Sequence, residues 1–181
     1  YANLSRGADS TGFFEEFQNI HKMAKPAPAV LSMPETTAFL DSACSGWLVG
    51  GHTRAASRGA VTDANSHPFK YGNIVGIHNG HVQAPQSYDV DSMLIFDELN
   101  KHNGDYQAAL KDISGYFAIA WYDGELLRLN THDHFVHLGR IGDTVYWSSE
   151  ALPLSAFGIR DIRRIENGDS VSVSRTGVVT D

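Results

Sequence analysis

Residues 65–80 read NSHPFKYGNIVGIHNG, an apolar segment placed between His-Pro and His-Asn-Gly. The apolar part is short and bounded by glycine, a pattern that predicts a buried strand over 73–78. Asn-Gly by itself is the commonest signal for a tight hairpin turn. A second apolar segment predicts a strand over 46–53 and also ends in polar residues, GHTR at 51–54. Two predicted strands therefore end in side chains suited to chemistry.

Turn signals and apolar patterning predict further strands on both sides of this stretch. Residues 12–17 and 19–25 are expected to form a hairpin, although a helix over 13–24 fits the spacing nearly as well. Toward the C-terminus, the hairpin dipeptides Asp123-Gly124 and Gly142-Asp143 break an apolar region into strands. The tail, 162–180, is expected to form strands around a turn at 167–169.

Helical periodicity is clearest at 89–102, where apolar residues at 90, 93, 94, 96 and 99 form one face and acids occupy the first turn. Shorter helices are expected from Pro34, at 105–113 and at 150–157. Many strands with few interposed helices predict an α+β fold with antiparallel sheets and helices outside. No repeat or linker divides the sequence, so we expect one domain over residues 1–181.

Composition excludes several classes of protein. The net charge of −7 argues against a nonspecific nucleic-acid or anionic-membrane surface, because no basic excess is present to replace counterions. No run approaches the ~20 apolar residues that span a bilayer, and the first residues lack a signal-peptide pattern. Cys44 is the only cysteine, which rules out a disulfide framework within the chain and favours a reducing, cytoplasmic location. We expect Cys44 to be a buried or half-buried structural residue.

The polar residues at the two strand ends suggest a small pocket. Arg54 presents a planar fork that suits a carboxylate, and the amide of Asn79 with the backbone N–H of Gly80 can hold a developing oxyanion. Taken singly, an arginine is more often a surface charge and a histidine more often a hydrogen-bonded structural residue. Together they predict a site for a small acyl substrate that carries a carboxylate.

Six motifs extend this interpretation across nearly the whole chain. They are RGADSTG at 6–12, GHTR at 51–54, NSHP at 65–68, HNG at 78–80, VDS at 90–92 and SSE at 148–150. In order and spacing the sequence resembles the class II glutamine amidotransferases, whose glutaminase domain is an N-terminal nucleophile hydrolase. The resemblance implies a four-layer αββα sandwich of two mostly antiparallel sheets with helices outside, here without the family's first strand and helix. It implies no cofactor and no metal.

The resemblance also implies a role for each matching residue. Arg54 would bind the α-carboxylate of glutamine and Asp91 its α-ammonium group. The remaining residues would be Asn79 and Gly80 in the oxyanion hole, Ser57 and His67 lining the glutamine site, and Arg6 and Asp9 supporting it. Asp91 is also explained as an acid at a helix N-terminus, and both roles are compatible. Ala55 and the pair Ser57-Arg58 depart from some aminosugar-forming members, so the ammonia acceptor of those relatives cannot be assumed.

The family's nucleophile is a cysteine at the mature N-terminus, whose own α-amine acts as the base. Tyr1 cannot serve, and the nitrogen of Cys44 is tied up in a peptide bond. We therefore expect the nucleophile upstream of Tyr1, and an ammonia-accepting synthase domain or partner protein beside the glutaminase. Two alternatives remain: a catalytically inactive binding or assembly module that keeps the fold, and an amidohydrolase of the same nucleophile class that acts on another amide.

A histidine-rich segment invites a metal hypothesis. His132, Asp133, His134 and His137 lie within six positions of one another. On a strand, 132 and 134 would share a face but 137 would not, and a metal site needs three or four converging ligands. We interpret them as strand and turn residues.

Overall fold

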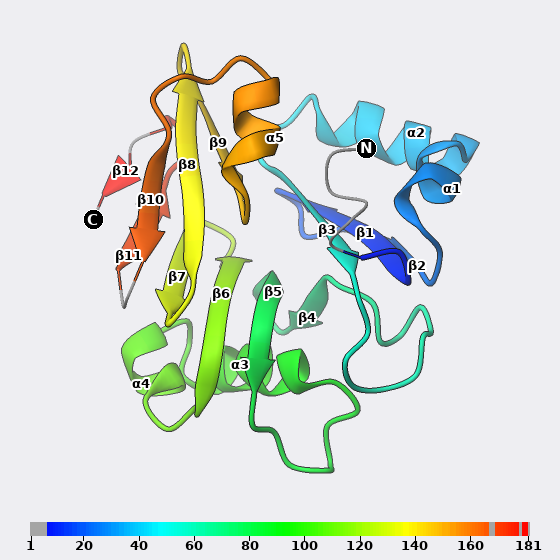
Figure 1. Cartoon of the computed structure of the whole chain (residues 1–181), viewed down its shortest axis with the longest axis vertical. Helices are drawn as coiled ribbons and strands as arrows, with labels where there is room; N and C mark the ends of the chain where they lie inside the picture. The colour runs from blue at the N-terminus through cyan, green and yellow to red at the C-terminus, as the bar shows by residue number, and fades with distance from the viewer. Residues whose placement is uncertain (1–6, 167–168, 178, 181) are drawn as a thin grey trace.

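The computed structural model describes residues 7–166, 169–177 and 179–180, and Figure 1 shows how its elements are arranged. The largest sheet has six strands in the order β12-β11-β7-β6-β5-β4. In chain order these strands are β4 (Phe69–Tyr71), β5 (Ile74–Val82), β6 (Gly115–Tyr122), β7 (Leu127–His132), β11 (Ser170–Val173) and β12 (Val179–Thr180).

Two smaller sheets of three strands each accompany it. We call β2-β1-β3 the first small sheet and β10-β8-β9 the second small sheet. Their strands are β1 (Ser10–Glu15), β2 (Ile20–Met23), β3 (Val49–Arg54), β8 (Phe135–Ile141), β9 (Thr144–Ser148) and β10 (Arg163–Glu166). Every strand pairing among the described residues is antiparallel.

The helices are α1 (Ala27–Leu31), α2 (Pro34–Ala43), α3 (Asp91–Lys101), α4 (Tyr106–Leu110) and α5 (Ala151–Ala156). One core lies between the six-stranded sheet and α3 with α4, where Phe96 and Leu99 meet Trp121. In Figure 1, α3 and α4 lie together, while α1, α2 and α5 lie toward the opposite end of the view. No helix in the described part of the chain is long and apolar enough to cross a membrane.

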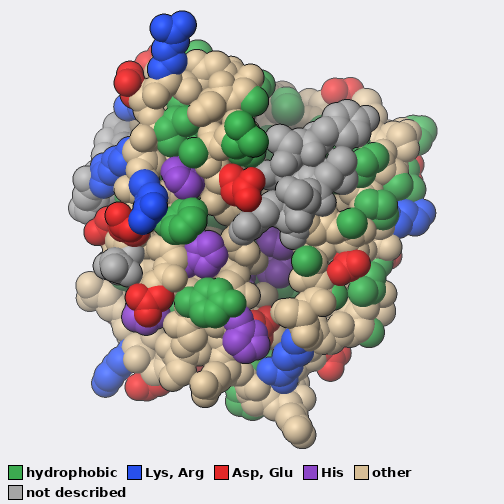
Figure 2. All heavy atoms as spheres, in the orientation of Figure 1, with side chains coloured by type: hydrophobic (Ala, Val, Ile, Leu, Met, Phe, Trp, Pro, Cys, Tyr) green, Lys and Arg blue, Asp and Glu red, His purple; other side chains and the backbone are tan. Residues whose placement is uncertain are grey.

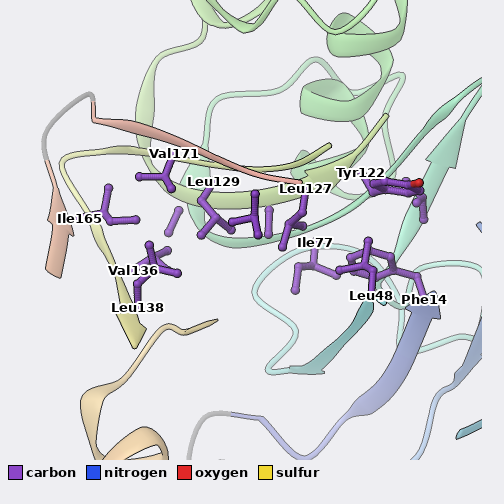
Figure 3. Close-up of a cluster of buried hydrophobic side chains, with 14 residues drawn as sticks. Phe14, Leu48, Ile77, Tyr122, Leu127, Leu129, Val136, Leu138, Ile165 and Val171 are labelled. Atoms are coloured by element: carbon purple, nitrogen blue, oxygen red, sulfur yellow. The ribbon is translucent and has the colours of Figure 1, made fainter. Parts of the chain in front are cut away.

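A second core lies between the six-stranded sheet and the two small sheets. Figure 3 shows Leu127 and Leu129 of β7 on one side, with Val136 of β8 and Phe14 of β1 among the side chains opposite. Alternate residues of each strand reach the two cores, as the period of a strand requires. The expected αββα sandwich of antiparallel sheets is confirmed.

The local predictions are mostly confirmed, with boundary differences. The hairpin of β1 and β2 forms, with Gln18 at φ 60° in its turn. Helix α3 forms as expected, but its buried face includes Ile95, which the predicted apolar face omitted. Helix α4 begins at Tyr106, because the side chain of Asp105 caps it by accepting from the N–H groups of Gln107 and Ala108, and it ends at Leu110, before the predicted 113.

The prediction for the end of β5 needs correction, whereas the tail forms strands as predicted. Asn79 and Gly80 do not turn the chain: β5 continues to Val82, and the two residues pair with Ala118 and Phe117 of β6. Gly80 has a φ of +137°, a conformation that favours glycine. This positive φ occurs inside a strand and not in the turn that Asn-Gly suggests. In the tail, β10 and β11 belong to different sheets, and the predicted turn at 167–169 falls largely outside the described residues.

The prediction that Cys44 is buried is wrong. Cys44 is exposed and forms the C-cap of α2, because the helix ends at Ala43. The buried residue at this end of the helix is Ala43. The face of α2 on which a residue lies therefore decides whether it is buried here. The apolar character of the thiol does not bury Cys44.

Candidate active site

A cavity of about 930 Å³ lies between the sheets. Both β3 and β9 are edge strands of their sheets, and both contribute residues to its walls. Its floor comes from the six-stranded sheet and includes Ile77 and Ala118. Among its polar wall residues are Thr53, next to Arg54, and Asn79, on the face of β5 that carries Ile77.

Arg54 ends β3 and is buried, with 4% of its surface exposed. Its Nη2 donates to the carbonyl oxygen of Arg58, and its Nη1 donates to that of Ala60 at 3.5 Å. Burial lowers the pKa of the guanidinium, and the negative charges of Asp9 and Asp91 oppose that shift. Two carboxylates from distant parts of the sequence thus stabilise the charge of Arg54, while its guanidinium donates to backbone carbonyls.

Asp9 joins the start of β1 to the loop after β3. Its Oδ2 accepts from the backbone N–H of Ala56 at 2.7 Å, and its own backbone N–H donates to the carbonyl of Arg54 at 3.0 Å. These bonds fix the backbone that follows Arg54 to the start of β1. The supporting role of Asp9 stays a prediction.

Asp91 is the first residue of α3 and is buried. Its Oδ1 accepts from the N–H of Ser92 at 3.0 Å, and its Oδ2 accepts from the N–H of Val82 at 3.1 Å. Nδ1 of His81 lies 3.6 Å from the same Oδ2. The end of β5 and the start of α3 are therefore joined through Asp91, and its charge also acts on Arg54 at the end of β3.

Behind this point lies a buried group of imidazoles. The hydroxyl of Ser92 is 3.0 Å from Nε2 of His67 and 2.8 Å from Nδ1 of His78, so it bridges the two rings. The ring of His52 lies 4.1 Å from that of His67, centroid to centroid. Nδ1 of His67 and Nε2 of His78 have no hydrogen-bond partner among the described residues.

Burial keeps these imidazoles neutral. It lowers the pKa of His52 to about 3, with a further lowering by the nearby His78. It lowers the pKa of His78 to about 4, against the opposing effect of Asp91. The pKa of His67 is well below its usual value for the same first reason, with His52 and His78 adding to it. The rings therefore act as neutral hydrogen-bonding and packing groups near neutral pH.

The structure brings together some of the predicted site residues and separates others. The charges of Asp9 and Asp91 act on Arg54, and Asn79 lines the cavity, whereas Arg54, Gly80 and Asp91 are not among its lining residues. His67 lies in the buried imidazole group and does not line the cavity. Ser57 is exposed in the loop after β3 and does not line it either. Arg6 lies outside the described residues.

Sequence reasoning missed three residues of this region. Ser92 lay in the VDS motif and His52 in GHTR, but only their neighbours received a role. Nε2 of His134 lies 3.5 Å from Nδ2 of Asn79, although the two residues are 55 positions apart in the sequence. No spacing in the sequence predicts this contact. The histidine-rich segment consists of strand and turn residues as expected, and no group of three or more possible metal ligands was found among the described residues.

No family model matches the chain. The chain is similar to the glutamine–fructose-6-phosphate aminotransferase (isomerizing) of Rhizobium leguminosarum bv. viciae, with 26% identity covering 96% of this chain and 32% of the relative. It is 33% identical to the enzyme of the same name from Streptococcus agalactiae serotype V over 54% of this chain and 15% of that relative. The chain thus spans about a third or less of the length of these curated relatives.

Solved structures share the fold. The glutamine phosphoribosylpyrophosphate amidotransferase from B. subtilis superimposes with a TM-score of 0.71 at 15% identity, over 98% of this chain and 43% of that chain. A predicted glutamine amidotransferase from Pseudomonas aeruginosa PA01 gives a TM-score of 0.60 at 19% identity, over 96% of this chain and 87% of that chain. In sequence the chain therefore resembles glutamine amidotransferases and it shares their fold, so the resemblance to the class II glutamine amidotransferases that its motifs indicate is confirmed.

Proposed function

We propose that this chain is a glutaminase domain that releases ammonia from glutamine through a cysteine thioester, in the cytoplasm. The observation that carries the proposal is that Arg54, at the end of β3, and Asp91, at the start of α3, are both buried, and the charge of Asp91 acts on the guanidinium of Arg54. A buried cation and a buried anion that influence each other match the α-carboxylate and α-ammonium groups of a free amino acid. Thr53 of β3 and Asn79 of β5 line the adjoining cavity.

The chemistry needs a thiolate and an oxyanion donor. The cysteine thiol gives its proton to the α-amine, the thiolate attacks the side-chain carbonyl carbon of glutamine, and the α-ammonium group passes that proton to the departing NH₂ group, which leaves as ammonia. Water then cleaves the thioester to give glutamate and the free thiol. We propose that the side-chain amide of Asn79 and the backbone N–H of Gly80 donate hydrogen bonds to the oxyanion of the tetrahedral intermediate.

The positions of β3 and β9 support a place for the nucleophile. Among the described residues each is the outermost strand at one edge of its sheet, and both border the 930 Å³ cavity. A strand added there would pair with both edges and join the two small sheets into one. The cavity is also far larger than a free amino acid requires. We infer that a cysteine-led strand from upstream of Tyr1 occupies part of it and brings the thiol toward Asn79.

The ammonia needs an acceptor. Two of the curated relatives are named as aminotransferases, and the chain covers only a part of each. We propose that an ammonia-accepting synthase domain or a separate partner protein adjoins this glutaminase.

The test is glutamate release by the protein with its native N-terminus. L-glutamine should be hydrolysed, whereas glutaramic acid, which lacks the α-ammonium group, and 4-aminobutanamide, which lacks the α-carboxylate, should be poor substrates. Arg54→Ala should abolish the preference for glutamine over 4-aminobutanamide, and the exposed Arg164→Ala is the matched control. Equal turnover of all three amides would favour an amidohydrolase of another specificity. Glutamine binding without turnover would favour an inactive module.

A further inference from the structure

His134 lies in the short connection between β7 and β8, where the chain passes from the six-stranded sheet to the second small sheet. Asp133 before it adopts a φ of +48°, which turns the backbone sharply. The imidazole lies between the rings of Tyr116 and Phe135, at centroid distances of 6.1 and 5.2 Å. Figure 2 shows histidine side chains gathered with hydrophobic ones on the face that lies over β5 to β8.

One hydrogen bond fixes the tautomer of this histidine. The backbone N–H of Phe135 lies 2.8 Å from Nδ1 of His134. A backbone N–H can only donate, so Nδ1 accepts and carries no proton. A neutral imidazole then bears its proton on Nε2, which makes Nε2 a donor.

That donor faces the side-chain amide of Asn79. Nε2 of His134 is 3.5 Å from the atom assigned as Nδ2 of Asn79. Two donors cannot form a hydrogen bond, and the nitrogen and oxygen of a carboxamide are distinguished only by their surroundings. The tautomer therefore places Oδ1 of Asn79 toward His134. Its NH₂ group then points away from the imidazole and is available to the cavity that Asn79 lines.

We propose that His134 is a positioning residue that turns the NH₂ group of Asn79 toward the reacting carbonyl oxygen. This inference rests on the proposed function, since it explains how Asn79 would be oriented as an oxyanion donor. Without His134 the amide can rotate and present its oxygen to the oxyanion, which is repulsive. Contacts in an unliganded site are often long and tighten when substrate binds, which accommodates the 3.5 Å separation.

The kinetic test compares His134→Ala with His134→Gln and with His132→Ala. Because oxyanion stabilisation acts in the transition state, His134→Ala should lower kcat by about 10- to 100-fold and change KM by less than about twofold. His134→Gln retains an N–H donor and should recover most of the loss. His132 is exposed and stacks on Phe117, so His132→Ala should leave kcat unchanged. A wild-type kcat for His134→Ala, in a variant with unchanged thermal unfolding, would overturn the proposal.

A spectroscopic test needs no turnover. Two-bond ¹H–¹⁵N correlation of the imidazole in the native chain should identify the Nε2–H tautomer of His134. The Asn79 side-chain NH₂ resonances, assigned by their loss in Asn79→Asp, should shift in His134→Ala. An Nδ1–H tautomer would overturn the inference. If the wild-type protein fails to hydrolyse glutamine, the proposed function fails, and the tautomer still decides how Asn79 is oriented.

Discussion

The backbone N–H of Val82 donates to Oδ2 of Asp91 at 3.1 Å, so the last residue of β5 is joined directly to the first residue of α3. The other carboxylate oxygen accepts from the helix N-terminus, which is where an acid is favoured. The two explanations of Asp91 are therefore compatible in one geometry. The bonds that make it a helix N-terminal acid also hold its charge near Arg54.

Asp91→Asn should raise the KM for glutamine by about tenfold or more, because a hydrogen bond to a charged group contributes about 1.5–3 kcal/mol. Asparagine keeps one oxygen to accept from a backbone N–H but loses the negative charge. The kinetic measurement is the dependence of glutamate release on glutamine concentration. Glu98→Gln, which removes a carboxylate from the opposite end of α3, is the control. An unchanged KM would remove Asp91 from the substrate site.

Ser92→Ala should destabilise the fold by about 1–3 kcal/mol, because two buried ring nitrogens lose their shared hydroxyl partner. Chemical denaturation measures the free energy of unfolding. Ser87→Ala, which changes an exposed serine, should have no comparable effect. If the two variants were equally stable, the hydroxyl bridge would not contribute to stability.

The free energy of unfolding should decrease as the pH falls below about 6.5, the usual histidine pKa. The buried imidazoles stay neutral in the fold while they protonate in the unfolded chain, so the unfolded state binds more protons. The loss continues toward about pH 4 for His78 and about 3 for His52. Each such group adds at most about 1.4 kcal/mol per pH unit. The measurement is the free energy of unfolding by chemical denaturation between pH 7 and 5, because most carboxylates stay ionised in this range.

A variant with one buried imidazole fewer separates this effect from the rest of the protein. His52→Gln should show a shallower dependence of unfolding free energy on pH than the wild type. His102→Gln, which removes an exposed ring from the end of α3, is the matched control. The same slope in all three proteins would show that the buried imidazoles do not set the acid sensitivity.

Cys44 should react readily with iodoacetamide, since it is exposed at the C-cap of α2. Because the proposed nucleophile lies elsewhere, Cys44→Ser should retain glutaminase activity and resist labelling at this position. The measurement is peptide mass spectrometry alongside glutamate release. Loss of activity in a folded Cys44→Ser protein would assign the thiol a role that the proposal does not give it.

Much of the layered fold was predictable, because strand alternation and the α3 periodicity are local properties of the sequence. The path of β5 through Asn79 and Gly80 was not, because the pairing with β6 overrides the turn preference of the dipeptide. The association of Arg54 with Asp91 came only from family motifs, since the two residues are far apart in sequence and no local pattern relates them. His134 near Asn79 depends on a crossing between two sheets, which no local pattern specifies.

Gly80→Ala should cost more stability than a glycine substitution at another positive φ. An added Cβ would lie against the carbonyl of Tyr116 and 2.8 Å from the Cα of Phe117, both on the backbone of β6. Gly142→Ala is the matched control, because its φ is +58° and nothing lies within 4 Å of an added Cβ. It should lose only about 1–2 kcal/mol for the left-handed backbone. Because the β6 backbone must shift to accept the methyl group, Gly80→Ala should at least double that loss and should also displace Asn79. Equal unfolding free energies for the two variants would mean that β5 and β6 are not packed as closely at Gly80 as the structure has them.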